Sequence, residues 1–294
     1  MEYRKLGHMD IDVSVITYGS FAIGDTMWGG TEKNEERFLS ILNVRKITLM
    51  AFCVMISFAA DAKHVVGTTA EAFGTRTVEP IVARLTRFEV KQEREQEFRK
   101  ILTEAVSFAM TLEGNIMVEA YHEVDQPLVL WFLERWVGPE DLEKFSKSNQ
   151  GRSLEAMRKE ALIKPPKTYV LRDLESLTKQ QWRAVPRRED KPLTVMLFVD
   201  ARVGTQQQFK DTYHIAMPKF RGETGVVTYQ LSEIEGDGTQ FVTYEKFRNP
   251  DAFQYHLNFP PVKPVIEYLE SNVKHPPFQN GLHNLVEIAP MTRE

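Results

Sequence analysis

The sequence predicts an α+β protein built from two tandem ferredoxin-like domains. Two observations carry this prediction: an internal repeat, and an order of strands and helices that occurs twice. A stretch around Glu134 and Pro139 recurs around Glu245 and Pro250, roughly 111 residues later, and such a repeat defines the organisation of a chain. Each copy indicates the end of a strand, then a turn, then a helix that proline opens at its first position.

The composition is that of a soluble globular protein. The 294 residues suggest about two domains, and 42% hydrophobic with 27% charged residues is typical of a packed fold. The net charge of -4 gives no support for a nucleic-acid or anionic-membrane partner. The single cysteine excludes an intrachain disulfide framework and a cysteine-based zinc cluster.

Residues 1–40 are β-rich and are interrupted by glycines. Tyr3-Arg-Lys-Leu-Gly7, Gly19-Ser-Phe-Ala-Ile-Gly24 and Trp28-Gly-Gly30 resemble the opening of an aldo-keto reductase. That resemblance implies catalytic Asp, Tyr, Lys and His motifs further along, and the sequence lacks them. A (β/α)₈ barrel also needs about 200 residues or more, while the rest of this chain follows another pattern. We interpret this segment as an orphan fragment without reductase chemistry.

Residues 41–62 have the features of a secretory signal peptide. The basic pair Arg45-Lys46 precedes the uncharged run 47–60, and Ala60-Asp-Ala62 is a small-x-small cleavage site. The run is too short for a transmembrane helix, although a buried core helix is an alternative. Its internal position suggests an upstream fusion or a mis-assigned start. We expect export, to the periplasm or the medium, if the segment is used, and a cytoplasmic protein otherwise.

After a polar linker at 63–77, the first domain (78–177) has the element order β-α-β-β-α-β, which defines a ferredoxin-like unit. Its long helix is supported by apolar residues at three- and four-residue steps, namely Phe98, Ile101, Leu102, Ala105 and Ala109. The expected elements are strands at 81–90, 115–124, 127–137 and 167–177, and helices at 92–110 and 139–148 and from Ser153 to 162. A two-residue link, Asp125-Gln126, is expected between the middle strands.

A linker at 178–191 precedes the second domain (192–294), in which the same order is expected. The middle strands form a hairpin around Gly236-Asp-Gly238, a typical turn sequence. The expected elements are strands at 193–203, 226–234, 240–247 and 282–289, a helix at 206–219, and a helix from Pro250 that breaks at Pro260-Pro261 and resumes to 273.

Both faces of the predicted sheets are apolar. Trp131 and Leu133 would lie on one face of a strand, and Leu130 and Phe132 on the other. Helices cover one face of a ferredoxin-like sheet, and an exposed apolar patch on the second face would favour aggregation. We therefore expect the two sheets to pack against each other as a pseudo-dimer within one monomeric chain and to enclose a cavity.

Residues 78–292 resemble antibiotic biosynthesis monooxygenase domains. The resemblance rests on Trp131-Phe-Leu-Glu-Arg-Trp-Val-Gly-Pro-Glu-Asp141 and on Tyr244-Glu-Lys-Phe-Arg-Asn-Pro-Asp-Ala-Phe-Gln-Tyr-His256. It implies a pseudo-dimeric α+β barrel. Members of this family include cofactor-independent oxygenases of polycyclic phenols and quinols, haem-degrading enzymes, and many proteins with no known substrate.

The resemblance implies that His256 is the catalytic residue, because the family has a histidine on this helix. A histidine can act as a general base near neutral pH, and the alternative is a histidine that only packs its helix. The first repeat has Phe145 at this position. Haem degradation also requires an Asn on the first strand and a Trp on the third. Trp136 and His256 lie in different repeats and neither first strand contains Asn, so haem degradation is disfavoured.

Aromatic and histidine side chains on the middle strands are candidates for lining the cavity. They would orient a phenol and accept its proton, and the anion could react with oxygen without a metal or a flavin. No Gly-x-Gly-x-x-Gly motif and no metal-binding histidine spacing occurs, so we expect no cofactor and no metal. The alternative is that these aromatics form the core. The predicted substrate-binding residues are Tyr121, His122, Trp131, Trp136, Tyr229 and Tyr244.

The sequence therefore predicts a cofactor-independent monooxygenase that acts on a quinol or a polycyclic phenol. The alternative is a non-catalytic small-molecule-binding barrel. A reductase is a remote third alternative, because the residues that such an enzyme uses for catalysis are missing.

Overall fold

The computed structural model describes residues 3–5, 12–14 and 81–294 of the chain. Strands β1 (Tyr3–Lys5) and β2 (Asp12–Ser14) pair antiparallel. The predictions for the rest of residues 1–80, which include the signal-like segment and the first linker, lie outside the described residues. Among the described helices, none has the length and apolar character needed to cross a membrane.

The predicted element order is observed in both repeats. The first repeat contains β3 (Val82–Glu89), η2 (Gln92–Arg94), α4 (Glu95–Thr111), β4 (Asn115–Glu123), β5 (Val129–Trp136), α5 (Pro139–Lys147), α6 (Asn149–Ala161) and β6 (Lys167–Leu174). After α7 (Lys179–Trp182), the second repeat contains β7 (Leu193–Asp200), α8 (Gln206–Arg221), β8 (Val226–Ile234), β9 (Gln240–Phe247), α9 (Pro250–Leu257), η3 (Pro260–Val262), α10 (Lys263–Ser271), α11 (Pro277–Asn280) and β10 (Leu282–Ala289).

The strands of the two repeats form one closed antiparallel barrel in the order β10-β4-β5-β3-β6-β8-β9-β7. The closing strand of each repeat joins the two sheets. One part of β6 pairs with β3 and its end pairs with β8, while β10 pairs with β7 and then with β4. This exchange confirms the pseudo-dimeric α+β barrel. It also leaves neither sheet with a free edge, which would be a site for aggregation.

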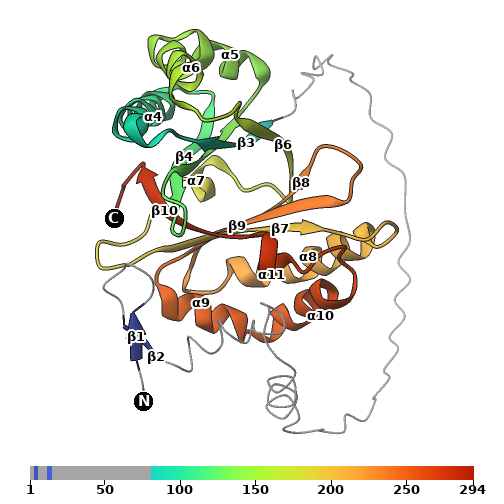
Figure 1. The fold of residues 1–294 in the computed structure, drawn as a ribbon. Helices are drawn as coiled ribbons and strands as arrows, with labels where there is room; N and C mark the ends of the chain where they lie inside the picture. Colours follow the sequence, from blue (N-terminus) through green and yellow to red (C-terminus); the bar gives the residue numbers. More distant parts are fainter. Residues whose placement is uncertain (1–2, 6–11, 15–80) are drawn as a thin grey trace, which may run out of the picture.

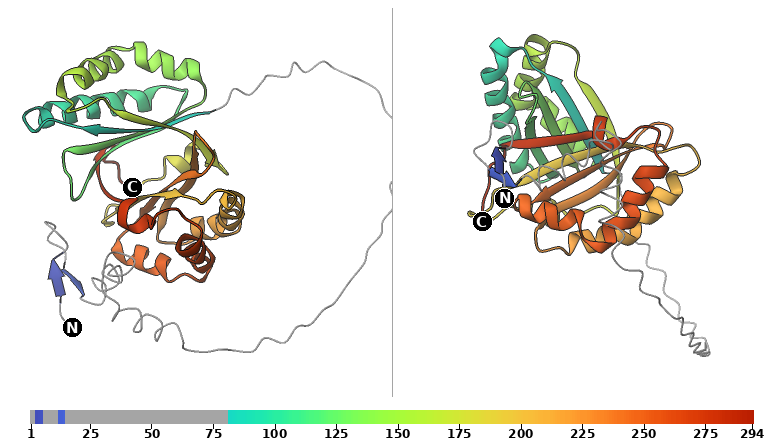
Figure 2. Two further views of the ribbon diagram at one scale, coloured as in Figure 1. Left: turned by 45° about the vertical axis from the view of Figure 1, so that its right-hand side comes forward. Right: turned by 60° about the horizontal axis from the view of Figure 1, so that its bottom comes forward.

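The helices lie outside the barrel, on opposite sides. Helices α4, α5 and α6 cover the outer face of the first sheet, and α8, α9 and α10 cover the outer face of the second (Figures 1 and 2). The space between the sheets is filled by side chains from every barrel strand, among them Leu85, Leu133, Leu171 and Met196. Each sheet therefore buries the apolar inner face of the other, which is the physical reason for having two copies of the domain.

The repeated glycine and proline residues fix how each third strand leads into its helix. Pro139 and Pro250 each occupy the first turn of a helix, α5 and α9, where a missing backbone N–H costs nothing. A β-carbon added at Gly114 would lie 2.0 Å from the Asp141 side chain, and one at Gly225 would lie 2.4 Å from the Cβ of Ala252. Glycine at this position lets the second strand pass close to the helix in both repeats.

Three local predictions are wrong. Helix α6 begins at Asn149 and not after Ser153, because the Ser148 hydroxyl accepts a hydrogen bond from the Gly151 N–H at 3.0 Å and caps the helix there. The link between β4 and β5 runs from 124 to 128 and is longer than the expected two residues. The segment 178–191 is more than a connection, since it contains α7, whose Trp182 is buried inside the barrel.

Candidate functional site

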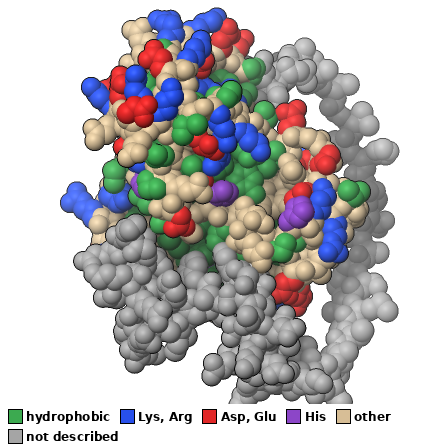
Figure 3. Space-filling view, viewed as in Figure 1, with side chains coloured by type: hydrophobic (Ala, Val, Ile, Leu, Met, Phe, Trp, Pro, Cys, Tyr) green, Lys and Arg blue, Asp and Glu red, His purple; other side chains and the backbone are tan. Residues whose placement is uncertain are grey.

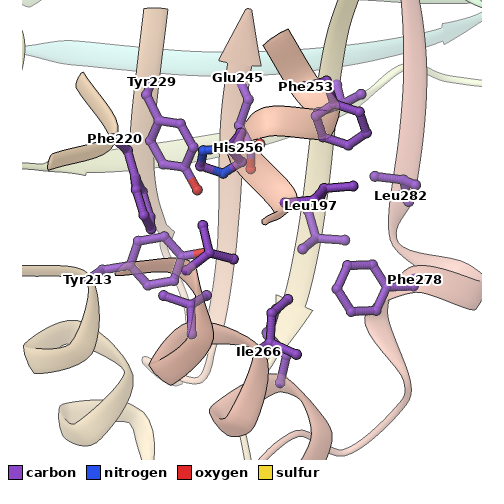
Figure 4. Close-up of a pocket in the computed structure, with 15 residues that line it drawn as sticks. Leu197, Tyr213, Phe220, Tyr229, Glu245, Phe253, His256, Ile266, Phe278 and Leu282 are labelled. Carbon is purple, nitrogen blue, oxygen red and sulfur yellow. The ribbon is translucent and has the colours of Figure 1, made fainter. Parts of the chain in front are cut away.

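A pocket of about 50 Å³ lies in the second repeat, between the outer face of the sheet and the helices α8, α9 and α10. Four polar side chains reach it from four elements: Tyr213 from α8, Tyr229 from β8, Glu245 from β9 and His256 from α9 (Figure 4). The rest of its wall is apolar, with Leu197, Phe220, Phe253, Val262, Val265, Ile266, Leu269, Phe278 and Leu282 among the lining residues. This is an apolar site with a few convergent polar groups, which is the usual composition of a small-molecule site.

His256 is held by a buried carboxylate. Its Nδ1 lies 2.8 Å from Oε1 of Glu223, and the side chains of both residues are almost completely buried. Glu223 follows the C-terminal end of α8, and its second oxygen has no hydrogen-bond partner among the described residues. The imidazole packs against the rings of Phe220, Tyr229 and Phe247 at centroid distances of 4.8, 5.5 and 5.2 Å. The ring is therefore fixed in one orientation.

The remaining polar groups form a second hydrogen-bonded chain. The Tyr229 hydroxyl hydrogen-bonds both the Tyr213 hydroxyl and the Glu245 carboxyl, and Glu245 also accepts from Thr243 Oγ1 at 2.7 Å. Burial raises the pKa of the Glu245 carboxyl, and nearby His256 opposes this shift. Burial also raises the pKa of Tyr229 well above its ordinary value, with a further contribution from Glu245. The two phenols therefore stay protonated at neutral pH.

The equivalent region of the first repeat is an apolar core. Trp136 stacks on Phe145 with ring centroids 5.2 Å apart, and its Nε1 donates to Glu134 Oε2 at 2.8 Å. The other oxygen of Glu134 accepts from Arg84 at 2.6 Å. Phe145 occupies the position of His256, and both rings are buried. The first repeat therefore has no imidazole–carboxylate pair at this place.

The structure divides the predicted site residues among several places. Tyr229 and His256 line the same pocket, which lies in the second repeat. Trp136 belongs to the core between the first sheet and its helices. His122 faces away from the barrel interior, near Glu95 and Arg99 of the first repeat, and its Nδ1 is 3.0 Å from the Glu123 carbonyl oxygen.

The expectation that the two sheets enclose the substrate cavity needs correction for three residues. Tyr121, Trp131 and Tyr244 lie between the sheets, where they belong to the packed barrel interior. The hydroxyls of Tyr121 and Tyr244 are 2.8 Å apart and both donate to Glu119, while Trp131 Nε1 donates to Glu123 at 2.9 Å. The pocket of His256 lies on the opposite face of the second sheet. Hydrophobic patterning shows that both faces are buried, and it does not show which of them leaves a hollow.

Two pocket residues, Tyr213 and Glu245, and the partner of His256, Glu223, are not among the residues predicted from the sequence. Glu245 has a counterpart, Glu134, in the first repeat, and Tyr213 fits the regular apolar pattern of its helix. Neither residue is therefore marked as functional by its own sequence context. A signal was nevertheless present at the aligned positions. Leu102, Leu112, Val118 and Phe145 of the first repeat correspond to Tyr213, Glu223, Tyr229 and His256, so polar groups replace apolar ones on three separate elements. Among the described residues, no group of three or more His, Cys, Asp or Glu side chains could hold a metal ion.

The fold and the site define a tandem ferredoxin-like barrel protein whose second repeat has a pocket with polar groups. The sequence profile described as antibiotic biosynthesis monooxygenase matches residues 81–156 and 192–268, one match in each repeat. Together the matches cover more than half of the chain, and the chain belongs to this family. The comparison with curated proteins finds no match.

Several solved structures are similar to this chain. A protein of Lactobacillus acidophilus NCFM, named "putative monooxygenase", has a TM-score of 0.61 at 12% identity and covers 72% of this chain and 95% of its own. A protein of Fusobacterium nucleatum with the same description has a TM-score of 0.60 at 12% identity, covering 71% and 93%. An anthrone oxidase-like protein has a TM-score of 0.48 at 15% identity, covering 73% and 96%. At such identities the first two show the fold alone.

Proposed function

We propose that this chain is a cofactor-independent monooxygenase that acts on a quinol or a polycyclic phenol in the pocket of the second repeat. Membership of the family supports a monooxygenase-type function. One observation carries the finer proposal: the buried His256–Glu223 pair, 2.8 Å apart, lies at a pocket that also holds two phenolic hydroxyls. A buried imidazole backed by a carboxylate is suited to remove a proton from a bound hydroxyl group.

In the proposed reaction His256 accepts the proton of the substrate hydroxyl through the ring nitrogen that is not bonded to Glu223. The carboxylate stabilises the imidazolium that forms. The phenolate is electron-rich and reacts with O₂. One oxygen atom enters the product, which becomes a quinone, and the other leaves as water with two hydrogens of the substrate. The substrate supplies all the electrons, so the balance requires no further reductant.

Tyr213 and Tyr229 are proposed to orient the substrate. Because burial keeps its hydroxyl protonated, Tyr213 is a donor to a developing negative charge on the substrate oxygen. The single hydroxyl hydrogen of Tyr229 is donated to the Glu245 carboxyl, so Tyr229 positions the Tyr213 hydroxyl beside it. A preorganised donor of this kind stabilises the anion more than the neutral phenol, so it favours the deprotonated form.

Binding must enlarge the pocket. Its volume of about 50 Å³ holds one or two water molecules, whereas pockets for drug-sized ligands have roughly 300 Å³ or more. Part of the apolar wall, Val262, Val265, Ile266 and Leu269, comes from η3 and α10. These two elements follow the end of α9 at Leu257 and begin at a Pro-Pro pair. We propose that α9, η3 and α10 move outward when the substrate enters.

The test is oxygen uptake by the wild-type protein with a panel of hydroquinones, naphthols and anthrones. The proposal expects one O₂ consumed per substrate oxidised, without added flavin, metal or nicotinamide. His256→Ala should lower the rate by a factor of about 10²–10⁴, the usual contribution of a positioned base, while the fold is retained. Unchanged turnover in this variant would remove His256 from the mechanism.

A non-catalytic binding protein is the second candidate. The observation that favours it is the small volume of the pocket, together with polar groups that hydrogen-bond one another. Saturable binding of a panel compound without oxygen uptake by the wild type would support this candidate against the oxygenase.

A further inference from the structure

A second cavity lies at one mouth of the barrel, away from the pocket of His256. Its volume is about 200 Å³, and both repeats build it. Lys167 and Tyr169 of β6 come from the first repeat, whereas Phe198 of β7, Gln240 of β9 and Asn280 of α11 come from the second. Neither repeat alone could form this cavity, so it exists only because the two sheets are closed into one barrel.

The floor of the cavity is aromatic. The rings of Tyr169 and Phe198 lie 5.2 Å apart at an interplanar angle of 51°, and both are partly exposed. Each also packs on the buried Trp131, with centroids 6.3 and 5.7 Å away. Hydrophobic side chains gather in the middle of this face, between the two halves of the molecule, with histidine and basic side chains beside them (Figure 3). Two ring faces anchored on a third are a rigid surface on which another ring can stack.

Charge at the mouth is unbalanced towards positive. Nζ of Lys167 lies 4.5 Å from the Tyr169 ring centroid, and among the described residues it pairs with no carboxylate. Two acids near the mouth are already paired. Asp200 accepts from Lys274 at 2.8 Å, and Glu123 accepts from Trp131 and lies 3.0 Å from His283 Nδ1. A ligand with one negative group would therefore meet a cation at the rim whose charge no carboxylate of the described residues neutralises.

We propose that the barrel mouth is a second ligand site, which takes a single-ring aromatic carboxylate. The ring would stack on Tyr169 and Phe198, and the carboxylate would pair with Lys167. The volume of about 200 Å³ selects one ring over a polycyclic system, since it is below the roughly 300 Å³ of pockets for larger ligands. This inference does not depend on the proposed oxygenase activity, because its residues lie outside the pocket of His256.

The experiment is an NMR titration of the isotope-labelled full chain with benzoate. Two matched probes separate the contributions: benzamide keeps the ring and removes the charge, and cyclohexanecarboxylate keeps the charge and removes the aromatic face. Benzoate should shift the signals of Tyr169, Phe198 and Lys167 saturably, and both other probes should bind more weakly. Benzoate that binds no better than either probe, or no saturable shift at all, would overturn the proposal.

Three variants sharpen the test. Lys167→Gln should weaken benzoate binding by about threefold to fivefold, the value of an exposed ion pair, and leave benzamide binding unchanged. Lys263→Gln makes the same charge change on α10, where Lys263 is exposed, and should have no effect. Tyr169→Leu should weaken benzoate and benzamide alike, because it removes part of the stacking surface. If His256→Ala abolishes benzoate binding, or the shifts centre on Tyr213 and Tyr229, the ligand occupies the other pocket and the proposal fails.

Discussion

The two repeats have the same fold and differ in what lies between sheet and helices. In the first repeat this space holds Trp136 stacked on Phe145, with apolar neighbours. In the second it holds the His256–Glu223 pair and two hydrogen-bonded tyrosines. The strands, the glycine before the second strand and the proline that opens the following helix are common to both. The comparison teaches that the duplicated backbone is a scaffold, and that a few aligned substitutions decide which copy has a polar pocket.

Energetics support a functional reading of that difference. Burying a hydrogen-bonded polar pair in place of apolar side chains of similar size is often neutral or destabilising, because the polar groups lose their hydration. The first repeat shows that the same fold accepts Leu112 and Phe145 where the second has Glu223 and His256. Glu223 also keeps one buried oxygen without a hydrogen-bond partner among the described residues. Stability therefore does not explain the polar pair, which favours a role in binding or chemistry.

The largest expected effect comes from making the second repeat like the first. The double substitution Glu223→Leu with His256→Phe installs the residues of repeat one. Turnover of a quinol should fall by a factor of about 10²–10⁴, because the proton acceptor is lost. Replacing the buried pair should leave stability unchanged or raise it by about 1–4 kcal/mol. Oxygen uptake and urea unfolding measure the two effects. Turnover at the wild-type rate in this variant would contradict the assignment of the site to the second repeat. A variant that does not fold would contradict the view that the two repeats share one scaffold.

The two joints between the repeats also differ. At the joint of β6 with β8, Arg135 donates to both oxygens of Asp173, at 2.6 and 2.9 Å. At the joint of β10 with β4, Lys246 donates to Glu119 at 2.8 Å, and Glu287 lies beside this pair. Burial, reinforced by the charge of Glu119 and opposed by that of Lys246, raises the pKa of Glu287 to about 7. The second joint therefore holds a carboxyl that titrates near neutral pH.

Glu287→Gln should reveal this difference as a pH dependence of stability. The folded-state pKa of about 7 exceeds the ordinary value of 4.5, so the folded protein binds the proton more tightly. The stabilisation is present below about pH 4.5 and is lost as the pH rises through about 7, a change of ~3 kcal/mol. Relative to the wild type, the variant should gain stability between pH 5 and pH 8 in urea unfolding. Glu143→Gln, on the exposed surface of α5, should not, and equal pH profiles for wild type and Glu287→Gln would contradict the assignment.

The architecture was predictable from the sequence, because a repeat, proline and glycine positions and apolar periodicity are local signals. Strands β8, β9 and β10 begin and end where the pattern predicted. The pocket was harder to predict, since its position depends on which face of a doubly buried sheet is less tightly filled. Tyr121 and Tyr244 are tyrosines on middle strands, as Tyr229 is, yet their side chains face the barrel interior. His256 was found through the family resemblance, and Glu223 needs the folded chain to bring it within 2.8 Å.

A smaller effect is expected from Glu223→Gln, which keeps the shape of the site. We assign Glu223 as a positioning residue, because it acts on the substrate through His256. Loss of a charge-assisted hydrogen bond worth about 1.5–3 kcal/mol should lower kcat by about 10–100-fold. In the background of His256→Ala, Glu223→Gln should lower kcat no further, because Glu223 acts only through the imidazole. A further fall in the double variant would indicate that Glu223 supports the packing of α8 against α9.

The smallest effect on catalysis is expected from Trp136→Phe. This substitution places phenylalanine at the position of the first repeat that corresponds to Phe247 of the second. The ring stack on Phe145 is kept, and the Nε1 hydrogen bond to Glu134 is lost. Glu134 still accepts from Arg84, so the cost in stability should be about 1–2 kcal/mol. Turnover should stay near the wild-type value, because nothing in this core reaches the pocket of His256. If Trp136→Phe lowers turnover as much as the loss of His256, both repeats contribute to the chemistry, and the division between scaffold and site proposed for them is wrong.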